Sequence, residues 1–367
     1  MKNEMQSLKH KRIMILAGGT GGHIFPAITV SERLEEQGCE IFWLGTEKGL
    51  EKKLIQGRFH IDYIQMKGLR NKGLLRYLIM PITLFKSIIA SIRVVRRHKI
   101  DLVLGFGGYI AAPGGLAAKL LFKPLIIHEQ NARSGLTNRL LAKLANNVLS
   151  AFEVPKLSRK LQVIGNPLRS EVLAVYNEDK VFSDERPYHI LVTGGSQGAQ
   201  IFNQLLPEVF SKLSQKKSII VRHQSGLSAS AETSEQYQKY QVNAQVIPFI
   251  TDIADTYRWA DIIICRAGAL TVSEVAACGI PAVFIPYPYA VDDHQYYNAQ
   301  ALVNAEAAVC IRQEAVSIEA LTSILTNLLQ SKEVLIEKST KAKAQAQIKA
   351  TEMMLEIVNK SLSKGSS

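Results

Sequence analysis

Residues 12–23 read RIMILAGGTGGH, and this stretch decides the fold of the first half of the chain. Its apolar run, residues 13–17, carries no charge, as expected of a strand that is buried on both faces of a parallel sheet. The glycines that follow have no Cβ atom, so a helix can begin at once with its backbone N–H groups exposed. The stretch therefore predicts a strand, a tight turn and a helix whose N-terminus attracts an oxyanion.

A second stretch with the same order of features is HILVTGGSQG, residues 189–198. Short β-branched runs that lead into helical periodicity surround both stretches. They lie at residues 12–17, 40–44, 102–104 and 125–128 in the first half, and at 189–193, 218–222, 245–248, 261–265 and 282–285 in the second. Alternation of strand and helix is typical of parallel sheets. We therefore predict an α/β fold with two doubly wound parallel sheets.

The length of the chain supports two domains, because 367 residues exceed the roughly 250 to 300 at which a single core stops growing. We place the boundary near Asn166, and the charged segment at residues 177–187 reads as a surface loop or linker. The predicted domains are residues 1–166 and 167–345. Residues 346–367 are predicted to form a C-terminal helix, for which a return to the first domain is one arrangement.

The net charge of +12 favours anionic partners: nucleic acid, a phosphate-bearing small molecule or an acidic membrane surface. No module of interleaved basic and aromatic residues is found, so we expect no nucleic-acid partner. The four cysteines form no C-x-x-C pair, which argues against a zinc site or a disulfide framework and favours reduced thiols in the cytoplasm. We expect no metal site and no cofactor.

Residues 67–99 combine apolar side chains with lysines and arginines, a composition that suits the surface of an anionic bilayer. Their most apolar part, residues 74–95, contains Arg76, Pro81, Lys86 and Arg93, and so fails the roughly 18-residue test for a spanning helix. We therefore expect peripheral membrane contact through residues 74–80. Residues 82–95 have the spacing of a core-packing helix.

The glycine turn at residues 18–22 departs from the dinucleotide-binding fingerprint. Ile24 stands five positions after Gly19, where the fingerprint has glycine, and the strand at residues 40–44 has no acid at its carboxyl end. NAD and FAD are therefore disfavoured, and no G-K-[ST] sequence forms a P-loop. A third open turn, GFGGY, lies at residues 105–109. We expect all three turns at the carboxyl edges of sheets, where open α/β folds bind ligands.

Residues 265–274, CRAGALTVSE, predict a further phosphate-binding helix start after the strand at residues 261–265. Thr271 and the N–H groups of the first turn suit a phosphate. Glu274 follows about one helical turn later, where its carboxylate can accept hydrogen bonds from two ribose hydroxyls. The alternative is that Glu274 is a solvated charge on the helix surface.

Segments in the same order along the chain resemble the MurG family of N-acetylglucosaminyltransferases. They are residues 18–23, 105–109, 128–131, 165–169, 194–199, 223–226, 266–274 and 295–298. The resemblance implies the GT-B architecture, in which two Rossmann-like domains face each other across a cleft. It implies an inverting hexosyltransferase that moves N-acetylglucosamine from UDP-N-acetylglucosamine to undecaprenyl-pyrophosphoryl-MurNAc-pentapeptide. That reaction converts lipid I to lipid II in peptidoglycan synthesis.

The resemblance also implies which residues bind the substrates, with the donor held mainly by the second domain and the lipid acceptor mainly by the first. The donor contacts from the first domain are Thr20, Gly21, Gly22 and Asn131. Those from the second are Arg169, Ser196, Ile250, Ala269, Leu270, Thr271, Val272, Ser273, Glu274 and Gln295. The implied location is the cytoplasmic side of the bacterial inner membrane, where other cell-wall synthesis proteins are candidate partners.

Each implied contact has a chemical reason. Ser196 and neighbouring backbone donors suit a pyrophosphate, and Arg169 adds positive charge. The amide of Gln295 can read sugar hydroxyls, and the backbone of Ile250 suits the edge of uracil. No Asp-x-Asp motif is present, which argues against a metal-bridged diphosphate.

Transfer requires a base that takes the proton of the attacking hydroxyl. His23 is our first candidate, because the dipole at a helix N-terminus disfavours imidazolium and keeps the ring able to accept a proton near neutral pH. Glu129 is the second candidate. The alternative is that His23 only caps or packs the turn.

Two other functions stay open: a UDP-N-acetylglucosamine 2-epimerase, which needs no lipid, and a non-catalytic subunit that binds a nucleotide sugar.

Overall fold

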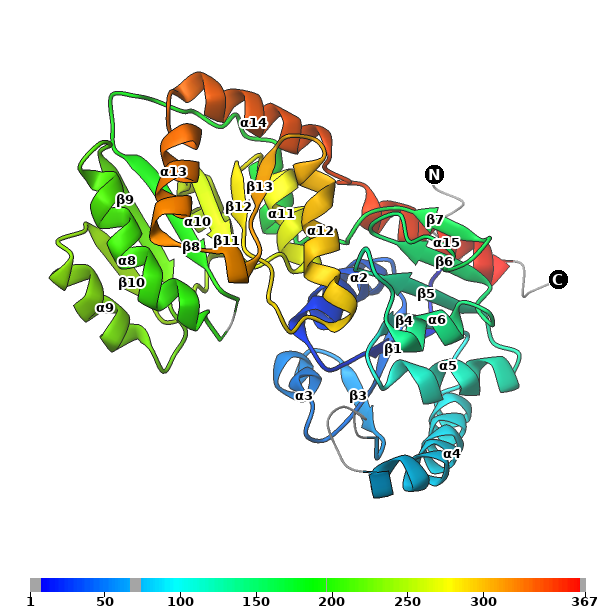
Figure 1. Ribbon diagram of the computed structural model, residues 1–367. Coiled ribbons are helices and arrows are strands. Elements are labelled where there is room, and N and C mark those ends of the chain that lie inside the picture. Colours follow the sequence, from blue (N-terminus) through cyan, green and yellow to red (C-terminus); the bar gives the residue numbers. More distant parts are fainter. Residues whose placement is uncertain (1–7, 67–73, 196, 364–367) are drawn as a thin grey trace. The chain divides into compact units, whose positions relative to one another are not determined.

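The computed structural model describes residues 8–66, 74–195 and 197–363, except for the side chains of residues 74–79. The chain forms two compact units. The first contains Met1–Leu168 and Ile348–Ser367, and the second contains Arg169–Gln347. Figure 1 shows the elements of both units in the order of the sequence. Each unit is built around one parallel sheet, which confirms the predicted α/β fold.

The first unit has a seven-stranded parallel sheet in the order β3-β2-β1-β4-β5-β6-β7. Its strands are β1 (Arg12–Ala17), β2 (Glu40–Gly45), β3 (His60–Tyr63), β4 (Leu102–Gly107), β5 (Leu125–Glu129), β6 (Asn147–Ser150) and β7 (Leu161–Val163). Its helices are α2 (Gly21–Glu36), α3 (Leu50–Ile55), α4 (Leu74–Arg97), α5 (Ala111–Leu120), α6 (Leu136–Leu141) and α15 (Ala350–Ser363).

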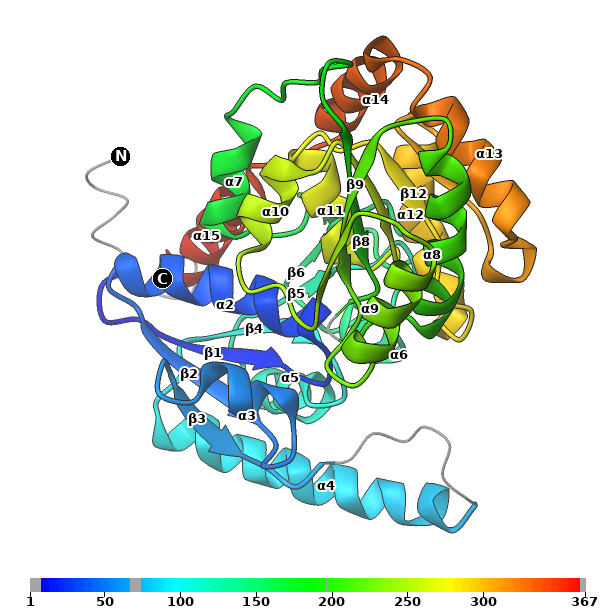
Figure 2. The same cartoon turned by 90° about the vertical axis from the view of Figure 1, so that its left-hand side faces the viewer.

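The central strand β1 is buried on both faces, as its uninterrupted apolar run predicts. Ile13 and Ile15 pack in one core with residues of α2 and α15, whereas Met14 and Leu16 pack in another with residues of α4 and α5. Successive side chains of a strand point to opposite faces, so one run of sequence supplies both cores. Figure 2 shows α2 and α4 on opposite sides of this sheet.

The second unit has a six-stranded parallel sheet in the order β10-β9-β8-β11-β12-β13. Its strands are β8 (Tyr188–Thr193), β9 (Ile219–Gln224), β10 (Ala244–Ile247), β11 (Ile262–Cys265), β12 (Ala282–Phe284) and β13 (Ala308–Cys310). Its helices are α7 (Ser170–Tyr176), α8 (Gln200–Ser214), α9 (Ser230–Lys239), α10 (Ile253–Trp259), α11 (Ala269–Ala277), α12 (His294–Val303), α13 (Ile318–Leu328) and α14 (Lys332–Ala344), with short 3-10 turns at Val291–Asp293 and Gln313–Ala315.

The two sheets repeat one hydrogen-bond arrangement at the amino ends of their central strands. In the first unit the carboxylate of Asp101 accepts from Arg12 N at 2.8 Å, and Asp101 N donates to Arg12 O at 2.8 Å. In the second unit Asp261 and His189 exchange the same two bonds, each at 2.8 Å. An aspartate just before β4 and another just before β11 thus bind the amino end of the neighbouring central strand in the same way.

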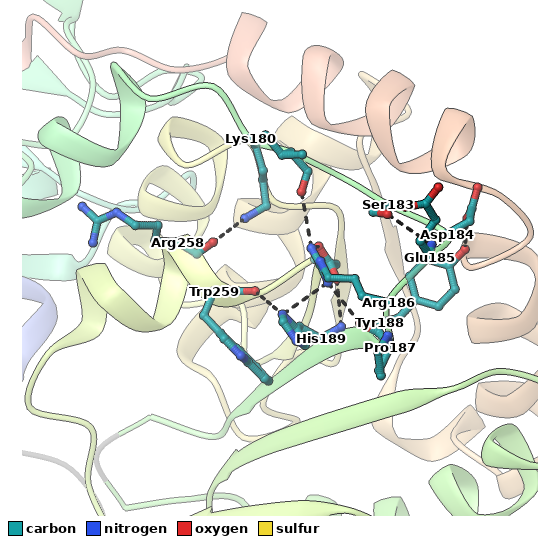
Figure 3. Close-up of polar contacts among 12 residues, drawn as sticks. Lys180, Ser183, Asp184, Glu185, Arg186, Pro187, Tyr188, His189, Arg258 and Trp259 are labelled. Atoms are coloured by element: carbon teal, nitrogen blue, oxygen red, sulfur yellow. Dashed lines mark hydrogen bonds and ion pairs between the residues drawn. The ribbon is translucent and has the colours of Figure 1, made fainter.

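The charged segment at residues 177–187 is fastened to the second unit. Arg186 donates two hydrogen bonds to Asp261, at 2.7 and 2.8 Å. Lys180 Nζ donates to Tyr257 O at 3.1 Å and to Arg258 O at 3.4 Å, and Figure 3 shows the second of these contacts. Burial lowers the pKa of Lys180 to about 8. The segment therefore follows the surface of the unit at defined contacts.

Within the described residues, no helix combines the length and the hydropathy that crossing a bilayer requires. The prediction that residues 82–95 form a core-packing helix holds for only part of that stretch. Val94 and Val95 are buried, but the side chains of Ile82 and Phe85 are 58% and 64% exposed. The residues proposed for membrane contact, 74–80, lie almost entirely outside the described side chains.

Candidate functional site

Each sheet has a point at which the strand order reverses, between β1 and β4 in the first unit and between β8 and β11 in the second. Open α/β sheets bind ligands outside the carboxyl ends of the strands at such a switch point. The glycine turns at residues 18–22 and 105–109 follow β1 and β4. The turns at residues 194–198 and 266–268 follow β8 and β11. The predicted turns therefore lie side by side in pairs: the turns after β1 and β4 in the first unit, and those after β8 and β11 in the second.

In the second unit, the turn after β8 is closed against the turn after β9. Gly198 has a φ of +73°, and a Cβ atom there would lie 1.9 Å from Ser225 O. Gly226 has a φ of +91°, and its Cβ atom would lie 2.3 Å from Gln197 O. Both positions therefore require glycine. Gln224 Nε2 donates to Gly195 O at 2.8 Å, so the HQSG segment at residues 223–226 supports the turn that is predicted to bind phosphate.

Helix α11 starts four residues after β11, as predicted, and its N-cap Gly268 has no side-chain cap. Thr271 and Leu270 are half-buried, whereas Ala269 and Val272 are buried, so the last two offer a ligand only their backbone. Ser273 Oγ donates to Ala269 O at 3.1 Å. The first turn of α11 therefore presents backbone groups and the Thr271 hydroxyl at the switch point.

Glu274 is buried, so the alternative that it is a solvated surface charge is wrong. Its Oε1 accepts a hydrogen bond from Arg169 Nη2 at 2.6 Å, and its Oε2 accepts one from the Tyr257 hydroxyl at 2.9 Å. Burial acts to lower the pKa of Arg169, but the ion pair with Glu274 outweighs it and the pKa is raised. Two of the predicted donor-binding residues, Arg169 and Glu274, thus contact each other. Tyr257, which the sequence analysis did not identify, also contacts Glu274.

Three other predicted donor contacts have different surroundings. Gln295, at the start of α12, accepts from Tyr287 N at 2.9 Å and thereby fixes the loop before its own helix. Ile250 is buried in the segment between β10 and α10. Ser196 lies outside the described residues.

Arg266, between β11 and α11, is a support rather than an exposed cation. It donates from Nη1 to Ile285 O at 3.0 Å and Pro286 O at 3.1 Å, and from Nη2 to Gln313 Oε1 at 2.8 Å. Its guanidinium lies 4.9 Å from the centre of the Phe202 ring. Burial lowers the pKa of Arg266. These contacts hold the end of β11 in place beneath the turn.

In the first unit, His23 lies in the first turn of α2, beside the turns after β1 and β4. Its Nδ1 is 3.1 Å from Gly18 O and 3.4 Å from Thr20 Oγ1. A carbonyl only accepts hydrogen bonds, so this contact assigns the ring hydrogen to Nδ1 and the lone pair to Nε2. A Cβ atom on Gly107, where φ is +100°, would lie 3.3 Å from Nε2. The glycine turn after β4 thus leaves room for the histidine ring.

Glu129, at the end of β5, is 2% exposed and accepts four hydrogen bonds. The donors are Asn131 N at 3.0 Å, Asn131 Nδ2 at 3.3 Å, Gly135 N at 3.1 Å and Asn138 Nδ2 at 3.0 Å. Burial raises the pKa of Glu129, and these hydrogen bonds act in the opposite direction. This geometry suits a residue that shapes the loop at Asn131 better than it suits a second base.

His128, the neighbour of Glu129 on β5, is enclosed by its hydrogen-bond partners. It is fully buried, its Nε2 lies 2.9 Å from Gly165 O, and its Nδ1 lies 3.1 Å from Gln130 Nε2. Burial lowers the pKa of His128 to about 4, so the ring is neutral at pH 7. It therefore links the end of β5 to the GNP segment at residues 165–167.

The sequence analysis found no acid at the carboxyl end of β2, but the fold brings one there from the next helix. Glu51, on α3, is fully buried, and its Oε1 accepts from Thr46 N at 2.9 Å and Thr46 Oγ1 at 3.0 Å. Because the Thr46 hydroxyl donates to Glu51, the Tyr109 hydroxyl 3.1 Å away donates to Thr46. A Cβ atom on Gly18 would lie 3.4 Å from Glu51 Oε1. The acid therefore lies beside the first glycine turn and orients Tyr109 of the third.

Two family domains match most of the chain. Residues 13–150 match the N-terminal domain of glycosyltransferase family 28, and residues 189–354 match its C-terminal domain. The Francisella philomiragia protein named UDP-N-acetylglucosamine--N-acetylmuramyl-(pentapeptide) pyrophosphoryl-undecaprenol N-acetylglucosamine transferase is 43% identical over 369 residues. The match covers 98% of this chain and 100% of that protein.

Solved structures share the fold. The crystal structure of Acinetobacter baumannii MurG superimposes with a TM-score of 0.82 at 38% identity, and covers 95% of this chain and 99% of that one. A putative UDP-N-acetylglucosamine 2-epimerase from Listeria monocytogenes superimposes with a TM-score of 0.68 at 14% identity, and covers 97% of both chains. At that identity the second likeness concerns the fold alone.

Proposed function

The chain belongs to the MurG transferases of glycosyltransferase family 28, and we propose that it transfers N-acetylglucosamine from UDP-N-acetylglucosamine to the muramyl sugar of undecaprenyl-pyrophosphoryl-MurNAc-pentapeptide. The reaction converts lipid I to lipid II in peptidoglycan synthesis. It is a hexosyl transfer with inversion, so the acceptor hydroxyl displaces UDP directly and no covalent sugar–enzyme intermediate forms.

His23 is the base in this proposal, and the contact of its Nδ1 with Gly18 O carries the assignment. The carbonyl fixes the tautomer in which Nε2 accepts a proton, and the N-terminus of α2 disfavours the charged ring. As the hydroxyl oxygen attacks the anomeric carbon, its proton passes to Nε2. Glu129 positions Asn131 and Asn138 around this place without taking the proton.

The second unit holds the nucleotide part of the donor. The turn at residues 194–198 and the first turn of α11 supply backbone N–H groups for the pyrophosphate, which gains negative charge as the bond to the sugar breaks. Glu274 binds the ribose hydroxyls after Arg169 turns from Oε1 toward the phosphates. The Arg169 side chain is 31% exposed, so the movement starts from a position that solvent already reaches.

The acceptor is a lipid, and the first unit carries exposed apolar side chains that suit a membrane surface. Ile82 and Phe85 of α4 are 58% and 64% exposed, and Leu120 and Phe122 at the end of α5 are 60% and 93% exposed. The two helices pack against each other. With the lysines of this region, the exposed side chains support peripheral docking on an anionic bilayer. We place the protein on the cytoplasmic face of the inner membrane.

The test is a transfer assay with labelled UDP-N-acetylglucosamine and lipid I or a short-chain analogue. We expect labelled lipid II from the wild type, and a loss of kcat of roughly 100-fold or more for His23→Ala. Lys332→Ala, at an exposed position of α14, is the matched control, and we expect it to keep full turnover.

The outcomes separate the parts of the proposal. If the wild type forms no labelled lipid, the transfer itself is refuted. Conversion of the free donor to its 2-epimer would instead identify an epimerase, and donor binding without any conversion would identify a non-catalytic subunit. Full turnover of His23→Ala would overturn only the base assignment.

A further inference from the structure

Two histidines and an aspartate of the first unit converge on one point. His60 Nε2 lies 3.1 Å from Asp62 Oδ2, and His98 Nε2 lies 2.7 Å from the same oxygen. The three side-chain atoms lie within 4.8 Å of one another. None of these residues takes part in the proposed transfer. His60 is the first residue of β3, Asp62 is the third, and His98 follows the end of α4, whereas the glycine turns follow the carboxyl ends of β1 and β4.

The fold brings these residues together for simple geometric reasons. His60 and Asp62 are two positions apart on β3, so their side chains point to the same face. Figures 1 and 2 both show β3 beside α4, and His98 follows the last residue of that helix. Phe42, in register with His60 on β2, lies 5.5 Å from the His60 ring and 4.5 Å from the His98 ring between centroids. The phenyl ring thus supports both imidazoles.

The approach of His98 to Asp62 is close but is not a hydrogen bond. His98 Nε2 is buried and has no aligned hydrogen-bond partner among the described residues, although Asp62 Oδ2 is only 2.7 Å away. The nitrogen and the oxygen thus lie side by side without a hydrogen bond between them. Arg97 Nη1 lies 3.5 Å from the other carboxylate oxygen, Oδ1, and supports the carboxylate from outside.

We propose that His60, Asp62 and His98 bind one divalent transition-metal ion, with Zn²⁺ as the preferred ion. Two imidazole nitrogens and one carboxylate oxygen are common zinc ligands, whereas Mg²⁺ and Ca²⁺ prefer oxygen ligands. Zinc bonds of about 2.0 to 2.1 Å in a tetrahedron place ligand atoms about 3.3 Å apart, so small side-chain movements form the site. Since His60 is 54% exposed, water completes the shell.

Such a site changes the stability of the first unit. The ion joins β3, the edge strand of the sheet, to the carboxyl end of α4. It binds only the folded chain, in which the three residues lie together, and therefore raises the free energy of unfolding as its concentration rises above the Kd. The four cysteines, which gave no zinc motif in the sequence, are not involved.

The experiment uses the full chain after treatment with a chelator. Zn²⁺ is titrated by calorimetry, and the Tm is measured with Zn²⁺, with Mg²⁺ and without metal. His98→Phe removes a ligand but keeps a ring against Phe42, and Asp62→Asn removes the charge. His10→Asn is the matched control, since His10 is exposed and asparagine tolerates its φ of +63°.

We expect one Zn²⁺ per wild-type chain, a Tm that rises with Zn²⁺ but not with Mg²⁺, and the same result for His10→Asn. The affinity of His98→Phe and Asp62→Asn should fall about 100-fold or more. Zinc affinity equal to the wild type in both variants, or a wild-type Tm that does not respond to Zn²⁺, overturns the site and leaves a metal-free ion-pair cluster. Circular dichroism checks that the variants fold, and their transfer activity keeps this test separate from the proposed reaction.

Discussion

Arg169 and Glu274 are 105 positions apart in the sequence, yet Arg169 Nη2 donates to Glu274 Oε1 at 2.6 Å. Tyr257 binds the other carboxylate oxygen, so the acid is held by two partners before any ribose arrives. Because Glu274 is also buried, a ligand hydroxyl reaches its carboxylate only where one of these partners moves aside. We therefore expect two measurable roles for Glu274, one in the stability of the second unit and one in donor binding.

Glu274→Ala should affect both roles. It leaves Arg169 and the Tyr257 hydroxyl without their partner, so the free energy of unfolding should fall by about 2 to 4 kcal/mol. Glu274→Gln keeps an acceptor for Tyr257 and should lose about 1 kcal/mol, but it should still raise the KM for UDP-N-acetylglucosamine about tenfold. Urea unfolding and donor kinetics measure the two effects. A KM for Glu274→Gln equal to that of the wild type would remove Glu274 from the ribose site.

Gly198→Ala should disrupt the donor turn. The new Cβ atom would lie 1.9 Å from Ser225 O, and the φ of +73° is unfavourable for alanine, so the backbone must move. We expect a free-energy loss above 2 kcal/mol and at least a tenfold weaker binding of UDP, measured by urea unfolding and calorimetry. Gly57→Ala is the control, because its φ is +84° but no atom lies within 4 Å of its Cβ position. Equal losses of unfolding free energy and of UDP affinity in the two variants would show that the contact with Ser225 O contributes to neither.

His223 should make the second unit sensitive to acid. Burial lowers the pKa of His223 to about 3, and its Nδ1 lies 2.8 Å from the Tyr237 hydroxyl. The unfolded chain, with a histidine pKa of about 6.5, binds the proton first as the pH falls. Stability is therefore complete above about pH 6.5 and decreases by about 1.4 kcal/mol per pH unit below it.

His223→Asn keeps an acceptor for Tyr237 and removes this titration. Its free energy of unfolding should therefore change less than that of the wild type between pH 7 and about pH 4, measured by urea unfolding at each pH. His10→Asn, at an exposed histidine, should follow the wild-type curve. Parallel curves for His223→Asn and the wild type would contradict the assignment.

Phe85→Ser and Phe122→Ser should weaken membrane binding. Each removes an exposed apolar side chain whose burial in a bilayer contributes about 1.5 to 3 kcal/mol, so binding to anionic vesicles should fall about 10-fold or more. Transfer to a water-soluble acceptor analogue should not change. Ile336→Ser is the control for sedimentation with vesicles, because Ile336 is an exposed apolar residue on α14 of the second unit. Unchanged sedimentation of the phenylalanine variants would exclude this surface.

Much of the fold follows from local patterns. The strands β1 and β8 were found because they are buried on both faces and read as uninterrupted apolar runs before glycine. The short strands β3, β6, β7 and β13 were missed because three or four residues are too few to show a period, even in β6, where three of the four are buried. The Asp101 and Asp261 contacts were equally invisible, since their partners lie 89 and 72 positions away.

The sequence by itself determined the two sheets, the turns that need glycine, and the ordered segments that identify the family. These are properties of short stretches, in which periodicity and the absence of a Cβ atom decide the outcome. The tertiary structure alone decided which distant side chains meet: Glu51 with Thr46, Arg169 with Glu274, and His98 with Asp62. The reason is that parallel strands bring residues far apart in the chain to one edge of a sheet, and only their positions in space fix hydrogen bonds, burial and pKa.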